Sequence, residues 1–90
     1  MGIANHEYRT YVVFMDNRIE VARRLRERRA AWCMTQRELA KVLGITQASV
    51  SRSETRGLTN LSDIERYAFA LVTNPVWLAF GFGNPEEGKS

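Results

Sequence analysis

The sequence predicts an all-α fold: a compact bundle of five helices preceded by an extra N-terminal segment. Three observations favour this fold. Apolar residues recur at steps of three and four, helix-capping residues stand where such runs begin, and Gly or Pro stands where they end. The chain has 90 residues, of which 44% are hydrophobic and 26% charged, which is typical of one small globular domain.

We expect residues 1–17 to form an N-terminal extension. Its segment 8–15 fits a strand by alternation of apolar and polar residues, and it also fits a helix, which is favoured. Asp16 or Asn17 can cap the next helix, which is expected at 18–32 because this stretch contains no Gly or Pro. The stretch is amphipathic, and its apolar side is formed by Val21, Ala22 and Leu25.

The second and third helices are short and are separated by a tight turn. Thr35 and Glu38 have the spacing of a capping box, which opens the second helix. Gly44 ends that helix, and Thr46 is an N-cap residue for a third helix over 47–55. The apolar stripe of the second helix consists of Leu39, Val42 and Leu43.

Two further helices complete the predicted domain, which spans residues 18–81. After a loop at 56–60, the helical period continues through Leu61, Ile64, Tyr67, Ala68, Leu71 and Val72. Asn74 and Pro75 form an N-cap followed by proline at the first helical position, which opens a short fifth helix. Residues 82–90 are expected to be a flexible tail.

Positive charge is concentrated in the middle of the chain. Residues 18–56 carry ten Lys and Arg against four Glu, whereas the segments before and after them are net negative. Such asymmetry favours binding to a polyanion or to an acidic surface. The alternative is a solvated, arginine-rich helix face.

The second and third helices have the residues of a helix-turn-helix. Ala40 is small where the two helices approach each other, and Gly44 supplies the permissive backbone that the turn needs. The inward-facing apolar positions are Leu39, Leu43, Ile45 and Val50. A generic helical hairpin is the alternative interpretation.

From about Val21 to Gly81 the sequence resembles the Cro/C1-type (XRE-like) helix-turn-helix regulators. The resemblance is carried by residues 24–27 (RLRE), 34–40 (MTQRELA), 43–47 (LGITQ), 50–54 (VSRSE) and 77–81 (WLAFG). It implies a lambda-repressor-like bundle of five helices that binds specific double-stranded DNA as a homodimer, usually to control transcription. Three features depart from the family pattern: Ser53, the helix ending at Thr55-Arg56-Gly57, and residues 1–17.

A helical wheel places one polar edge of the third helix outward, opposite Val50. Its side chains are small near the N-terminus, as a helix that enters the major groove requires. Gln47 suits adenine, Arg52 suits guanine, and the Ala48 methyl suits a thymine methyl. The expected base-reading residues are Gln47, Ala48, Ser51 and Arg52; an ordinary soluble surface is the alternative.

Phosphate contacts are expected beside this edge, because the N-terminus of the second helix suits an anion. The candidates are Thr35, Gln36, Arg37, Thr46 and Arg56. The resemblance further implies that Gln36 touches the DNA backbone and buttresses Gln47. Such contacts position the protein rather than read the sequence.

Arg29 falls in line with Val21 and Leu25 on the apolar stripe, where an unpaired charge is costly. Glu54 is the best-placed acidic partner, and the family resemblance independently implies the same pair. We therefore expect an Arg29–Glu54 ion pair that links the first and third helices.

The chain has more aromatic residues than a small core needs. We assign Trp77, Phe80 and Phe82 to a dimer interface, with ordinary core filling as the alternative. Cys33 stands where the family commonly has a glycine between its first two helices, and we expect no chemical role for it.

Other classes of function are less consistent with the sequence. It has no Gly-rich phosphate loop and no recognisable nucleophile with its base, so we expect no enzyme and no cofactor. With a single Cys and a single His we expect no metal site, and no apolar stretch is long enough for a membrane span. We expect a cytoplasmic protein. The main alternative is an antitoxin-like module that binds a toxin and regulates its own operon, and RNA binding is a third option.

Overall fold

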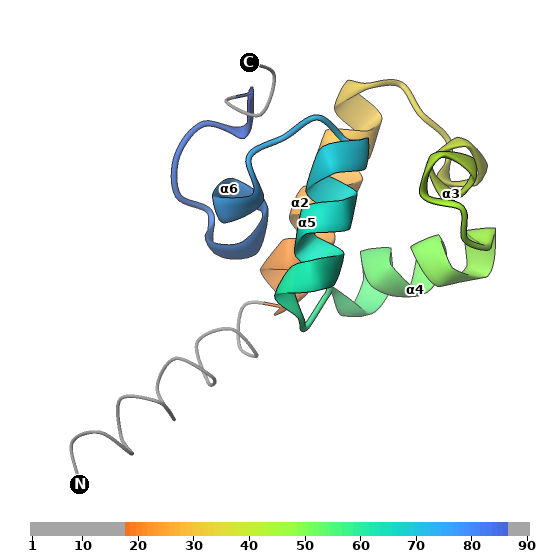
Figure 1. The fold of residues 1–90 in the computed structure, drawn as a ribbon, viewed down its shortest axis with the longest axis horizontal. Coiled ribbons are helices and arrows are strands. Elements are labelled where there is room, and N and C mark those ends of the chain that lie inside the picture. Colours follow the sequence, from red (N-terminus) through yellow and green to blue (C-terminus); the bar gives the residue numbers. More distant parts are fainter. Residues whose placement is uncertain (1–17, 87–90) are drawn as a thin grey trace, which may run out of the picture.

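The structure is a computed structural model, and it describes residues 18–86. Five helices are present in this range, and no strand is: α2 (Arg18–Ala31), α3 (Gln36–Leu43), α4 (Gln47–Arg56), α5 (Leu61–Ala70) and α6 (Pro75–Phe80) (Figure 1). The predicted all-α bundle is therefore confirmed. None of these five helices has the length and apolar character needed to cross a bilayer. The expectations for segment 8–15 and for a cap at Asp16 or Asn17 lie outside the described residues.

The helices pack around one core. α2 contacts α4 and α6, while α3 contacts α4 and α5, and α5 also packs against α6. α4 lies at one edge of the bundle, away from α6 (Figure 1). The largest fully buried side chains come from all five helices and the turn after α5: Val21, Leu25, Leu39, Val50, Ile64, Leu71 and Leu78.

Four of the helices begin at side-chain caps, because the first backbone N–H groups of a helix have no partner within it. The Thr35 hydroxyl accepts from the Glu38 N–H at 3.0 Å, and the Glu38 carboxylate accepts from the Thr35 N–H at 2.8 Å, which completes the capping box. The side chains of Thr46, Asn60 and Asn74 cap α4, α5 and α6, because each accepts from a backbone N–H in the first turn of its helix. The caps expected at Thr35, Thr46 and Asn74 are confirmed.

The turn between α3 and α4 depends on a left-handed glycine. Gly44 has φ 72° and caps α3, and the Ile45 N–H donates back to the Ala40 carbonyl at 3.0 Å. Gly57, which caps α4, has φ 81°, and a Cβ atom there would lie 2.0 Å from the Arg18 carbonyl oxygen. A side chain at Gly57 would therefore separate the start of α2 from the end of α4.

Several boundaries differ from the sequence prediction. α5 ends at Ala70 rather than Val72, because Val72 adopts φ 48°, which an α-helix does not allow. α2 ends one residue before Trp32, and Cys33, at φ 54°, takes the left-handed conformation that favours glycine. The segment 82–86, expected to be tail, is held at Pro85, whose carbonyl accepts from Thr73 and Asn74.

Besides Arg29, the inner face of α2 contains Arg24 and Arg28, which were not expected there from the sequence. Arg24 is buried, and its guanidinium donates to the carbonyls of Leu78 and Ala79 at 2.9 and 3.2 Å. These contacts tie α2 to the end of α6, and burial lowers the pKa of Arg24. Arg28 is also buried, and it lies 5.4 Å from the ring centre of Trp32.

Candidate nucleic-acid interface

α4 presents a polar edge to solvent. All four expected base-reading residues are exposed: Gln47, Ala48, Ser51 and Arg52. The opposite side of the helix contacts the core through Val50, which is fully buried, and through Glu54, which is 2% exposed. The orientation expected from the helical wheel is therefore the one that the structure has.

A short chain of hydrogen bonds orders the outer face of α4. The Thr46 hydroxyl accepts from the Ser49 N–H at 3.1 Å and donates to the Ser49 hydroxyl at 3.0 Å. The Arg52 guanidinium donates to that same Ser49 hydroxyl at 3.2 Å. Thr46, expected to contact phosphate, thus already serves as the helix cap, while Arg52 lies along the exposed side of the helix.

Glu54 is the structural centre of this region. Its carboxylate accepts from Arg29 at 2.5 and 2.9 Å, which is the ion pair expected from the sequence. The same carboxylate accepts from the Gln36 amide at 3.1 Å, and the Glu54 backbone carbonyl accepts from Arg26. One residue therefore links α4 to both α2 and α3. The hydrogen bond with Glu54 also raises the pKa of Arg29.

The contact of Gln36 differs from the one that the family resemblance implies. Instead of a hydrogen bond to Gln47, the structure shows one to Glu54. Gln36 and Gln47 nevertheless line the same hollow of about 520 Å³, together with Thr35 and Arg37. This hollow opens at the N-terminal ends of α3 and α4, so three of the expected phosphate-binding residues lie beside the first base-reading residue.

A second polar hollow, of about 270 Å³, lies on the other flank of α4. Arg52 and Arg56 line it from the helix, and Thr59 lines it from the loop that follows. Both arginines were among the DNA contacts expected from the sequence. Thr59 was not, since a threonine in a loop carries no distinguishing pattern. A hollow therefore flanks the exposed edge of α4 on each side, and each hollow is lined by at least one arginine.

The structure also sorts the ten cations of residues 18–56 by role. Arg24, Arg26, Arg28 and Arg29 point inward to carbonyls or to Glu54, and Arg23 pairs with Glu20 and Glu27 at 3.0 and 2.7 Å. The other five are exposed and form no ion pair with any residue of the range 18–86: Arg18, Arg37, Lys41, Arg52 and Arg56. Four of these five residues lie on α3 and α4, so most of the positive charge left for a partner is on these two helices.

The residues expected at a dimer interface do not share one environment. Trp77 packs partly buried against the core of its own chain, Phe80 is 36% exposed, and Phe82 is 69% exposed. Among residues 18–86, the most exposed aromatic is Phe69 on α5, at 87%. Phe69 was given no role of its own from the sequence, although its absence from the apolar stripe of α5 was a usable signal of exposure.

No protein-family model matches this chain, and a search of the solved structures found no significant match. Among the described residues, no three His, Cys, Asp or Glu side chains are placed to hold a metal ion.

Proposed function

We propose that this protein is a transcriptional regulator that binds specific double-stranded DNA as a homodimer, with α4 in the major groove. The observation that carries the proposal is the exposed polar edge of α4 between two arginine-lined hollows. The resemblance of the sequence to Cro/C1-type regulators supports the same function. A regulator of this kind acts where the DNA is, so we propose a cytoplasmic location.

The edge of α4 has the chemistry to read bases. Gln47 stands at the first position of the helix, where its amide can pair with an adenine edge. Arg52 lies more than one turn further along and suits the two acceptors of guanine. Ala48 and Ser51 are small, so they let the helix backbone approach the floor of the groove.

The two hollows suit the two phosphate backbones that border a major groove. Arg37, with Thr35 and Gln36, would contact one strand, and Arg56 with Thr59 would contact the other. Such contacts would fix the depth and tilt of α4 in the groove, because they bind the duplex on both flanks of α4. Glu54 then acts as a positioning residue, since it holds α4 against α2 and α3.

A homodimer would extend this recognition to a palindromic operator. Two copies of α4 that enter successive major grooves lie about 34 Å apart along one face of the duplex. Doubling a small interface in this way raises affinity, because the second site binds at high effective concentration.

The test is selection of binding sites from random duplex DNA, followed by titration of the selected duplex with the purified protein. We expect an enriched palindromic site, which base substitutions weaken by about 1–3 kcal/mol each. The matched competitor is duplex RNA of the same sequence, which should not displace the DNA because its major groove is deep and narrow. Selection that enriches no motif, or equal competition by RNA, would contradict the proposal.

A further inference from the structure

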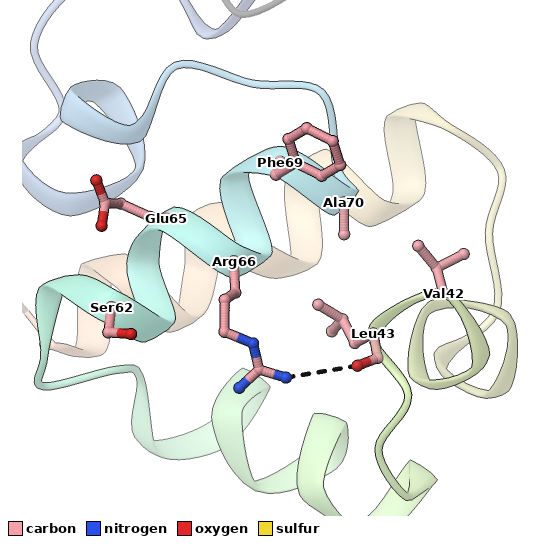
Figure 2. A pocket seen from close by; sticks show the side chains of 7 residues that line it. All are labelled: Val42, Leu43, Ser62, Glu65, Arg66, Phe69 and Ala70. Atoms are coloured by element: carbon pink, nitrogen blue, oxygen red, sulfur yellow. Dashed lines mark hydrogen bonds between the residues drawn. The ribbon is translucent and has the colours of Figure 1, made fainter.

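An uncovered face of α5 has the geometry of a self-complementary surface. Four exposed residues, Ser62, Glu65, Arg66 and Phe69, share one side of this helix (Figure 2). On a helical wheel they fall within a sector about 100° wide. Phe69 projects from one end of this face with 87% of its surface exposed, which is a large apolar area for a free surface.

The surroundings of Phe69 are hollow and partly apolar. A groove of about 630 Å³ between α3 and α5 is lined by Val42, Leu43 and Ala70 as well as by the four residues of the face (Figure 2). A second hollow of about 450 Å³ lies between α5 and the start of α6. Phe69 lines both, so it forms a ridge between two depressions.

The charges on this face extend to opposite flanks of α5. Glu65 points away from α3, whereas Arg66 points toward α3 and donates to the Leu43 carbonyl at 3.4 Å (Figure 2). Arg66 also lies 3.5 Å from Asp63, and both contacts are long enough to leave its donors available. Glu65 forms no ion pair within residues 18–86.

A half-turn about an axis between Glu65 and Arg66 brings this face onto itself. The two copies of α5 are then antiparallel. Each residue of one copy faces the residue of the other that lies equally far from the axis in the sequence. Glu65 meets Arg66 of the second copy, and the bulky Phe69 meets the small Ser62 of the second copy. Each contact occurs twice, as a two-fold interface requires.

We propose that this α5 face binds the same face of a second copy of the chain. Two reciprocal ion pairs and two phenyl rings that each cover a serine make the contact both charge-complementary and shape-complementary. This face supplies the partner surface for the homodimer of the proposed function, on which it rests. It replaces the surface expected at Trp77, Phe80 and Phe82. Because the mass in solution tests it without DNA, the two proposals can fail separately.

The experiment is sedimentation velocity of the full chain over a wide concentration range. We expect a concentration-dependent dimer that Phe69→Ser weakens about thirtyfold or more, because Phe69 supplies the largest apolar contact and supplies it twice. The matched control is Phe82→Ser, which removes another exposed aromatic and should leave the dimer unchanged. Circular dichroism and urea midpoints verify that both variants fold, which their exposure favours.

Charge exchange gives the sharper test. Glu65→Arg and Arg66→Glu should each weaken the dimer, since each places like charges opposite one another twice. The double variant restores opposite charges and should restore the dimer. A chain that stays monomeric at every concentration, a dimer that survives Phe69→Ser, or a double variant that fails to recover would each overturn the inference. A Phe69→Ser monomer that still prefers the operator half-site would leave the DNA proposal intact.

Discussion

The Arg29 guanidinium and the Glu54 carboxylate meet at 2.5 and 2.9 Å, with the Glu54 side chain only 2% exposed. This pair joins the middle of the bundle to the helix that carries the base-reading residues. Since Arg26 and Gln36 also bond to Glu54, the position of α4 depends on one buried acid.

Breaking this pair should destabilise the fold strongly. We expect Arg29→Ala to lower the free energy of unfolding by about 3–5 kcal/mol, because it leaves Glu54 buried without its counter-charge. Urea denaturation measures the change. Arg23→Ala, which removes an exposed pair on the same helix, should have little effect. Equal midpoints for the two variants would rule out a structural role for the buried pair.

Arg52→Ala should relax recognition at one base pair rather than weaken all binding. The discrimination lost should be about 1–3 kcal/mol, because a bidentate contact to guanine accounts for that much. The measurement compares affinities for the selected operator and for the operator changed at that base pair. A uniform loss over all duplexes would instead assign Arg52 to phosphate.

Arg37→Gln should lower the salt dependence of DNA binding. Log affinity falls with log salt by about 0.9 for each phosphate contact, so losing one contact should make the slope shallower by about one. Arg23→Gln makes the same change of charge outside the proposed interface and should keep the original slope. Matching slopes for all three proteins would place Arg37 outside the interface.

Cys33→Gly should stabilise the protein by about 0.5–1 kcal/mol. Cys33 has φ 54°, and relief of this strain exceeds the entropy that glycine adds to the unfolded chain. The reverse change, Gly44→Ala at φ 72°, should destabilise by about 1 kcal/mol, because no neighbouring atom within 4 Å adds a steric term. Thermal melts measure the stability of both variants. A destabilised Cys33→Gly variant would show that the thiol has a packing role.

Stability should fall at alkaline pH through Tyr67. Burial raises the pKa of this phenol, which donates to the Ser53 hydroxyl at 2.9 Å. Above the unfolded pKa of about 10, the unfolded chain loses its proton first, so the free energy of unfolding decreases as pH rises toward the folded pKa. Tyr67→Phe should make this decrease shallower in urea titrations between neutral and alkaline pH. An unchanged slope would place the titrating group elsewhere.

The elements that sequence predicted well depend on local chemistry. Thr35, Thr46 and Asn74 cap helices through neighbouring backbone atoms, and Gly44 turns the chain through its own dihedral freedom. The exposed edge of α4 was also predictable, because Val50 fixes which side of the helix faces the core.

The features that sequence missed depend on tertiary contacts. Arg24 and Arg28 follow the spacing of the apolar stripe, but only the carbonyls of distant residues show that their guanidinium groups are buried. Val72 ends α5 early through a backbone conformation that its residue type disfavours. Gln36 bonds to Glu54 because α2 and α3 converge on that acid.

The close approach of Gly57 to Arg18 has a practical consequence for labelling. Because the Arg18 backbone lies against Gly57, the C-terminal cap of α4, a fluorophore attached at position 18 would report on the end of that helix. Glu86, by contrast, follows Pro85, which is anchored to the turn between α5 and α6. A label attached at Glu86 would therefore lie beside that turn rather than beside α4.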